Sequence, residues 1–241
     1  MCTVTIIPKG TNDFVLTSNR DEAPNRISSS PEFYTIEGVK TLFPKDELSE
    51  GTWIGVSEKN RLICVLNGGF IIHERQAEYR KSRGVVAKDF MIAEDVISLV
   101  GKYDLKGIEP FTMVIVDWTA GLQLFELVWD GSKKHVSELP LEPKLWSSST
   151  LYTEAMKKER QRWFKIFKAE NDLNAESILT FHKEAGGDNE DYGVIMDRYF
   201  VKTTSITQVE KQGDAVDMSY ENLQDGTIAN KTFSLPQIVN E

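Results

Sequence analysis

The sequence contains few residues of the kinds that bind metals or form disulfides. It has two cysteines, Cys2 and Cys64, and three histidines, His73, His135 and His182. Two cysteines are too few for a disulfide framework, and the histidines lack the paired spacing of metal ligands. A glycine-rich phosphate loop is also missing. We therefore expect a protein that uses no metal and no cofactor.

Long apolar runs and a surplus of positive charge are missing as well. No run approaches the roughly 20 apolar residues that cross a bilayer, so we expect no integral membrane segment. The first residues lack the basic start and the apolar stretch of a signal peptide, which makes a cytoplasmic location the default expectation. The formal net charge is −9. Nucleic acid is therefore an unsuitable general partner, since phosphate contacts need a surplus of Lys and Arg.

The order of the predicted elements indicates the fold class. A chain of 241 residues can bury a sizeable core without disulfides, and we expect one domain over residues 1–241. Strands precede helices, and the alternation does not repeat as it does in parallel βαβ folds, which favours an α+β fold with antiparallel sheets. The predicted strands are Thr3–Ile7, Phe14–Ser18, Thr52–Ser57, Arg61–Asn67, Phe111–Trp118, Leu122–Trp129, Val194–Val209 and Ala215–Tyr220. One predicted helix begins near Ser82 and a second, short one ends at Gly101. Two more predicted helices span Thr153–Glu170 and Ala175–Lys183.

The segment from Glu22 to Glu50 gives a weaker pattern. It contains Pro24, Pro31 and Pro44, and proline interrupts both helices and central strands. We predict a loop with a short strand in this part of the chain.

Cys2 is the residue with the clearest chemical meaning. Removal of the initiator Met1, which is usual when the second residue is small, would place a thiol and a free α-amino group on one residue. The amine titrates near ~7.7–8.0 and a thiol near ~8.5, so the amine can accept the thiol proton at neutral pH. A cysteine here can equally be a small buried hydrophobic residue, and both interpretations are open. Cys64, inside a strongly apolar run, is expected to be a buried core thiol.

The segment from Ser18 to Glu22 reads Ser-Asn-Arg-Asp-Glu and follows a predicted strand. A hairpin with the first strand would return this segment to the end of the sheet where Cys2 lies. Arg20 would then stabilise a thiolate and lower the pKa of the thiol. Asp21 would accept hydrogen bonds from the α-amino group and orient it. The alternative is a surface turn with a local Arg–Asp pair.

The start Met-Cys-Thr, followed by Asn19-Arg20-Asp21-Glu22, resembles the NRDE family, also called the transport and Golgi organisation protein family. Further matching stretches occur in the family's usual order, and the resemblance covers most of the chain. These stretches are Gly51-Thr52-Trp53-Ile54-Gly55-Val56, Leu66-Asn67-Gly68-Gly69, Ser82-Arg83-Gly84 and Phe111-Thr112-Met113-Val114.

The N-terminal pattern of this family is similar to that of choloylglycine hydrolases and penicillin acylases, which are N-terminal-nucleophile (Ntn) hydrolases. The resemblance implies an αββα four-layer sandwich, with two antiparallel sheets between helices, in agreement with the element order. It also implies that Asn67 donates a hydrogen bond to a developing oxyanion. Asn19 and Gly68 are then expected at the substrate. An Asn-Gly turn that closes a hairpin is the alternative for Asn67.

The chain departs from the family pattern at two places. Trp146-Ser147-Ser148-Ser149 stands where the family usually has Leu-Ser-Asn, so Ser148 replaces an amide that could help to stabilise the oxyanion. Phe200-Val201-Lys202-Thr203 stands where the family usually has Gly-Thr-Arg. Lys202 retains a cation but not the planar guanidinium; it contacts an anionic substrate or is simply an exposed strand residue.

These features lead to three hypotheses. The preferred one is hydrolysis of a non-peptide C–N amide, or of a related thioester or ester, through an acyl-Cys2 intermediate. The second is a non-catalytic binding or trafficking protein for an apolar ligand such as haem or an acyl-CoA-like molecule, which the resemblance also implies. The third is a structural or interaction protein on the same scaffold. The sequence leaves the oligomeric state open.

Overall fold

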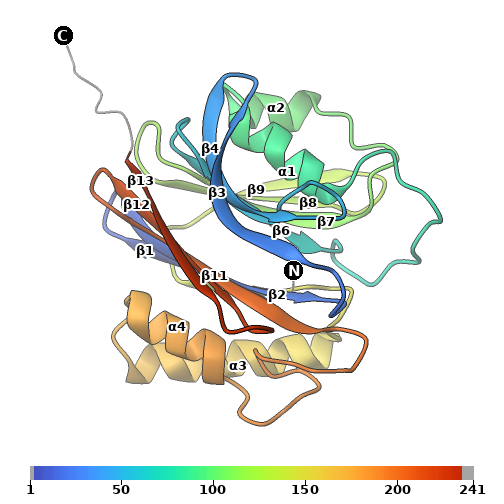
Figure 1. Ribbon diagram of the computed structural model, residues 1–241, viewed down its shortest axis with the longest axis vertical. Helices are drawn as coiled ribbons and strands as arrows, with labels where there is room; N and C mark the ends of the chain where they lie inside the picture. The colour runs from blue at the N-terminus through green and yellow to red at the C-terminus, as the bar shows by residue number, and fades with distance from the viewer. Residues whose placement is uncertain (1–2, 235–241) are drawn as a thin grey trace.

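The computed structural model describes residues 3–234 as two antiparallel sheets packed face to face, with two helices on each outer face (Figure 1). The predicted αββα sandwich is therefore confirmed. The six-stranded sheet has the order β10 (Lys144–Ser147), β1 (Thr3–Lys9), β2 (Asp13–Glu22), β11 (Lys202–Gln212), β12 (Ala215–Asn222) and β13 (Ile228–Ser234). The seven-stranded sheet has the order β3 (Ser28–Ile36), β4 (Val39–Asp46), β5 (Ile54–Ser57), β6 (Arg61–Asn67), β7 (Phe111–Asp117), β8 (Gln123–Trp129) and β9 (Lys134–Leu139).

The helices form two separate pairs. In Figure 1, α1 (Arg83–Ile92) and α2 (Val96–Lys102) lie against the seven-stranded sheet, and α3 (Glu154–Glu170) and α4 (Ala175–Glu184) lie against the six-stranded sheet. Each begins at a side-chain cap, because the first N–H groups of a helix have no partner within it; the caps are Ser82, Asp95, Thr153 and Asn174. Within residues 3–234, none of the helices combines the length and the apolar character that crossing a bilayer requires.

Strand alternation divides the apolar residues among three layers. In β6, Leu62, Cys64 and Leu66 face the core between the sheets, whereas Ile63 and Val65 pack towards α1 and α2. In β1 and β2 the same period of two sends Val4 and Leu16 to the inter-sheet core and Ile7 and Val15 towards α3 and α4. The two sheets are therefore buried on both faces where they carry the residues discussed below.

Several predicted elements need correction. The segment from Glu22 to Glu50 is not mainly loop, because it forms β3 and β4. Pro31 is accommodated at a register irregularity between Ser29 and Glu32 in β3, which is an edge strand. The strand predicted from Val194 begins only at Lys202, because the chain turns before it, with Tyr199 at φ 63°. The short or largely exposed strands β9, β10 and β13 were not predicted at all.

A buried histidine joins α4 to the six-stranded sheet. His182 Nδ1 lies 2.6 Å from Asn19 Oδ1 and its Nε2 lies 2.8 Å from Thr5 Oγ1. Asn19 Nδ2 donates to two backbone carbonyls, so Asn19 Oδ1 is an acceptor and His182 carries its proton on Nδ1. Burial, together with the charge of Arg160, lowers the pKa of His182 from 6.5 to about 3.

We predict that His182 makes the fold acid-sensitive. The folded state keeps the imidazole neutral, whereas the unfolded chain protonates it below about 6.5, so stability is lost as the pH falls from 6.5 towards 3. The contribution is about 1.4 kcal/mol per pH unit within that window. Thermal unfolding of His182→Gln across the window should show a weaker pH dependence than the wild type. An unchanged acid slope would contradict this role.

Candidate functional site

The hairpin of β1 and β2 carries the NRDE segment. Thr3 pairs with Asn19 and Val4 with Ser18, so the predicted hairpin is confirmed. It brings Arg20 and Asp21 to the end of the sheet at which β1 begins. Cys2 itself lies outside the described residues.

Neighbouring residues of β2 point to opposite faces of the sheet, as strand geometry requires. Arg20 faces the seven-stranded sheet, where it contacts Asp46 and Trp53. Asn19 faces α4 and binds His182. The structure therefore does not bring Asn19 to the substrate position that the resemblance implied; its side chain is fully buried and connects a strand to a helix.

Arg20 is fixed by several contacts. Its Nη2 donates to Asp46 Oδ2 at 2.7 Å, its Nη1 donates to Thr204 Oγ1 at 3.1 Å, and its guanidinium lies 4.8 Å from the centroid of the Trp53 ring. Burial raises the pKa of Asp46, but hydrogen bonds from Arg26 and Ser49 outweigh this effect, so that the pKa is below its usual value. Arg20 is thus a cation held in one place by an ionised carboxylate.

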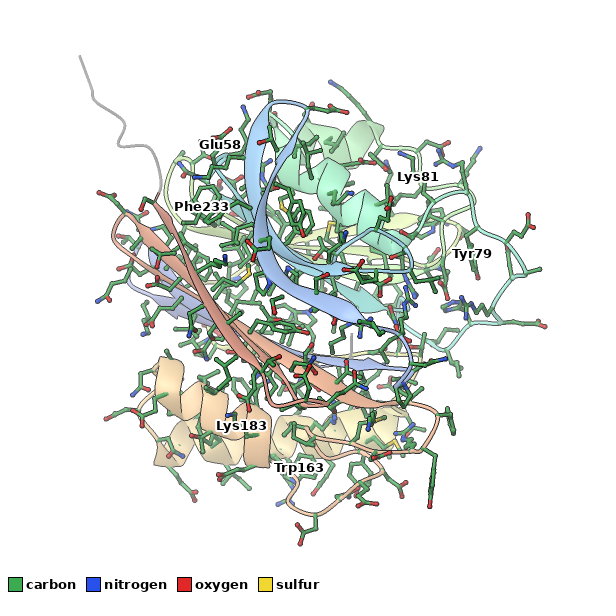
Figure 2. All side chains as sticks on the ribbon, in the orientation of Figure 1. Glu58, Tyr79, Lys81, Trp163, Lys183 and Phe233 are labelled. Atoms are coloured by element: carbon green, nitrogen blue, oxygen red, sulfur yellow. The ribbon has the colours of Figure 1, made fainter. Side chains whose placement is uncertain are left out.

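A cavity of about 330 Å³ opens beside Arg20. Arg20 comes from the six-stranded sheet and Asn67 from the seven-stranded sheet, and both line this cavity. Figure 2 shows two further lining residues, Tyr79 and Lys81, on the long segment that leads from β6 to α1. A second hollow of about 220 Å³ shares Asn67 as a lining residue. Arg20 and Asn67, predicted to act on the same substrate, therefore border the same space.

The cavity wall carries ionised groups of both signs. Arg83 Nη2 lies 3.1 Å from Glu109 Oε2, and Arg26 joins Glu22 at 3.2 Å and Asp46 at 2.8 Å. Burial lowers the pKa of Arg83, and the Glu109 carboxylate opposes that effect. These pairs make a rigid polar wall around the position of Arg20.

The loop that follows β6 accepts hydrogen bonds from the segment after β10. Ser148 Oγ donates to the Asn67 carbonyl at 2.7 Å, and Ser149 Oγ donates to the Gly69 carbonyl. Ser148 is buried and contacts the backbone of Asn67. Its position makes Ser148 a support for Asn67.

Gly68 is required by this packing. It has φ +84°, and a Cβ atom at this position would lie 2.7 Å from Ser149 Oγ and 2.9 Å from Thr150 Cγ2. We predict that Gly68→Ala costs about 1 kcal/mol for the left-handed backbone and a further ~1–3 kcal/mol for overpacking. Gly121→Ala is the matched control, because Gly121 has φ +99° and nothing within 4 Å of the added carbon. Urea unfolding of both variants would separate the two contributions; equal losses would contradict the packing argument.

Asp21 lies on the helix-facing side of β2 and is buried. Tyr152 Oη donates to Asp21 Oδ2 at 2.6 Å, and Thr203 Oγ1 donates to Asp21 Oδ1 at 2.7 Å. Both carboxylate oxygens are therefore held by neutral hydroxyl groups. This arrangement fixes the orientation of a carboxylate next to the start of β1.

Two other predicted residues lie apart from the cavity. Lys202 begins β11 opposite Glu22, and it lines neither of the two hollows described above. Cys64 is fully buried, as predicted, and burial raises the pKa of its thiol to about 12. Among residues 3–234, no group of three or more His, Cys, Asp and Glu side chains is arranged to hold a metal ion.

The ion pairs of the cavity wall were not predicted from the sequence, although a signal was present. Trp53 and Arg83 belong to the matching stretches Gly51-Thr52-Trp53 and Ser82-Arg83-Gly84. Their glycines pack backbone to backbone: a Cβ on Gly51 would lie 2.7 Å from the Gly84 carbonyl carbon. This contact draws the start of α1, and with it Arg83, against the segment that carries Trp53.

The sandwich and its N-terminal hairpin define the class: the fold is that of the Ntn hydrolases. The chain is similar to penicillin V acylase from Agrobacterium tumefaciens, with a TM-score of 0.54, 10% identity, and coverage of 95% of this chain and 85% of that one. It is similar to an N-acylethanolamine-hydrolyzing acid amidase ortholog from Caenorhabditis elegans, with a TM-score of 0.59, 10% identity, and coverage of 86% and 92%. The chain is also similar to a variant of conjugated bile acid hydrolase from Clostridium perfringens, with a TM-score of 0.54, 11% identity, and coverage of 100% of this chain and 99% of that one.

The likeness to these solved structures shows the fold alone, because their sequences are so different. The family is shown by sequence. The model of the Transport and Golgi organisation 2 family matches residues 1–225, and the chain belongs to this family. A comparison with curated proteins gives no match.

Proposed function

We propose that the protein is an Ntn-type cysteine amidohydrolase, which cleaves a non-peptide C–N amide, or a related thioester or ester, through an acyl-Cys2 intermediate. The observation that carries the proposal is the cavity beside Arg20, which Arg20 and Asn67 line from different sheets. A nucleophile between a fixed cation and an amide donor has the surroundings that acyl transfer requires.

The register of β1 supports this assignment. Each step towards the N-terminus in β1 is matched by one step towards the C-terminus in β2 and in β10, from Ile6 to Thr3. If both series continued by one residue, the first would pair residue 2 with Arg20 and the second would pair it with Ser148. Because paired residues of antiparallel strands project to the same face, Cys2 is expected beside Arg20 and beside the residue that supports Asn67.

The proposed reaction uses one residue as nucleophile and base. Cys2 Sγ attacks the substrate carbonyl carbon while the thiol proton moves to the α-amine, directly or through water. Asn67 donates to the oxyanion, and Arg20 favours the thiolate. Collapse breaks the C–N bond, and the leaving amine takes the proton from the α-ammonium. Water then attacks the thioester with the α-amine again as base, which releases a carboxylic acid and restores the thiol.

Apolar side chains at the cavity favour a substrate with an acyl chain. Leu48, 80% exposed, lines the main cavity, and Ile72, 71% exposed, lines the second hollow; Phe70 and Ile71 precede Ile72 and are also exposed. Exposed apolar residues beside a polar site suit a ligand with an apolar portion and a polar head. The proteins of similar fold are named as an acylase, a hydrolase and an amidase. We propose here a substrate in which an acyl chain is joined to a polar group through an amide, thioester or ester bond.

The first test is the intact mass of the natively expressed protein before and after exposure to iodoacetamide at neutral pH. We expect loss of Met1 and fast labelling at Cys2, with no fast labelling in Cys2→Ala. Buried Cys64 serves as an internal reference for a slow thiol. Retention of Met1, or labelling no faster than that of a cysteine peptide, would contradict the proposal. Positive labelling leads to a screen of fatty-acyl amides and thioesters.

A second candidate function is a carrier for an apolar ligand, and the same exposed side chains favour it. A carrier would bind an acyl-CoA-like molecule or haem without turnover. The two functions separate in one experiment: a hydrolase releases free acid and loses that activity in Cys2→Ala, whereas a carrier retains the intact ligand in both proteins. Ligand binding with no product in the wild type would favour the carrier.

A further inference from the structure

Arg160 is a buried cation without a carboxylate partner in the part of the chain described, Thr3–Ser234. Its side chain is fully buried. Its guanidinium donates to the carbonyls of Tyr192 and Gly193 at 2.8 and 2.6 Å, and to Thr3 Oγ1 at 2.6 Å. A charge removed from water is costly unless something compensates it. Neutral oxygens satisfy its N–H groups but do not neutralise its charge.

Arg160 is linked to an acidic group, Asp21, through a shared neighbour, Tyr152. The guanidinium carbon of Arg160 lies 3.6 Å from the centroid of the Tyr152 ring, which is a close cation–π contact. The hydroxyl of the same ring donates to Asp21 Oδ2 at 2.6 Å. Tyr152 is itself buried. Arg160, Tyr152 and Asp21 therefore form one row, with the cation at one end and the carboxylate at the other.

The same arginine also holds the start of β1. Its Nη1 donates to Thr3 Oγ1, and Thr3 is the residue that directly follows Cys2. One side chain thus touches both Thr3, the first residue of β1, and the ring that holds Asp21. A cation above the ring polarises the Tyr152 hydroxyl and strengthens it as a donor to the carboxylate.

We propose that Tyr152 and Arg160 are positioning residues for Cys2. Arg160 fixes Thr3, and Tyr152 fixes the carboxylate of Asp21, so that the α-amine of Cys2 is held where it can accept the thiol proton. The inference rests on the proposed function, because it assigns a task to Asp21 that exists only if Cys2 is the nucleophile. A base displaced from its proton loses much of its rate advantage.

The test is the rate of Cys2 alkylation by iodoacetamide at neutral pH in Tyr152→Phe. This change removes the hydroxyl and leaves the ring beneath Arg160. We expect labelling to be ~10-fold to ~100-fold slower than in the wild type. In an Asp21→Asn background, Tyr152→Phe should produce no further loss, because both changes break the same link. Tyr192→Phe is the matched control: the Tyr192 ring stacks on Trp163 at 5.8 Å, and we expect wild-type labelling.

Each outcome separates this inference from the proposed function. Equal losses from Tyr152→Phe in the wild-type and Asp21→Asn backgrounds would show that Tyr152 does not act through Asp21, and would overturn the inference. Wild-type labelling in Tyr152→Phe would do the same and leave Cys2 as the nucleophile. Slow labelling of the wild-type protein would remove the proposed function itself. The double-mutant cycle measured on unfolding free energy checks independently that Tyr152 and Asp21 interact.

Discussion

Replacement of Asn67 by alanine is expected to slow the acylation of Cys2 by about 10²–10³-fold, the effect of losing one donor to an oxyanion. The measurement is the burst of nitrophenolate from 4-nitrophenyl acetate, with the acyl-enzyme followed by mass. The backbone contact between Ser148 and the Asn67 carbonyl is retained in this variant, so the loop should remain in place. Cys2→Ala defines complete loss of the burst.

A second reagent shows whether the loss is specific to acyl transfer. In alkylation by iodoacetamide the thiolate displaces iodide from a CH2 carbon and no oxyanion develops, so the labelling rate of Asn67→Ala should equal that of the wild type. Asn67→Asp is the matched variant, because it keeps the shape of the side chain and replaces the donor by an acceptor; we expect a loss at least as large as in Asn67→Ala. Normal acylation in both variants would leave Asn67 as a turn residue only.

The sequence predicted the parts of this site that depend on local structure. Turn-forming residues between two β-prone runs specify the hairpin of β1 and β2, and its register then determines that Asn19 lies opposite Thr3. The strand end at Asn67 follows from the apolar run that precedes it. These features need only a few neighbouring residues, and all of them are seen in the structure.

The face of β2 on which each side chain lies was harder to predict than the position at which the strand ends. Asn19, Arg20 and Asp21 are consecutive, and only the alternation of β2 assigns Arg20 to the cavity and its two neighbours to the helix layer. The burial of both faces of β2 conceals this division, because neither face is marked by polar residues exposed to solvent. The resemblance alone placed Asn19 at the substrate, whereas the structure places it against α4.

Long-range polar contacts could not be predicted from the sequence, for a different reason. Tyr152 and Asp21 are separated by 131 positions, and no local pattern connects them. The prolines of β3 and β4 predict interruptions in the sequence pattern, whereas an edge position and a register irregularity accommodate Pro31 in the structure. In both cases tertiary packing decides the structure and local propensity does not.

The second large effect is expected in stability. Arg160→Ala should lower the free energy of unfolding by about 3–5 kcal/mol, because the buried carbonyls of Tyr192 and Gly193 lose their donor and a cavity remains beside Tyr152. Urea unfolding monitored by tryptophan fluorescence would measure it. Arg162→Ala is the control on the same helix: Arg162 is exposed and forms an ion pair with Glu159 at the surface, so we expect little change in the free energy of unfolding.

Arg160→Met distinguishes hydrogen bonding from packing. Methionine fills much of the volume of the arginine stem, but it donates nothing to the two carbonyls or to Thr3. If the stabilisation by Arg160 comes from satisfying buried acceptors, Arg160→Met should be nearly as unstable as Arg160→Ala. Recovery of most of the wild-type stability in Arg160→Met would show instead that the apolar stem stabilises the fold. In that case the hydrogen bonds of the guanidinium would not be needed for stability, and the role left for them would be to position Thr3 at the start of β1 and, through Tyr152, Asp21.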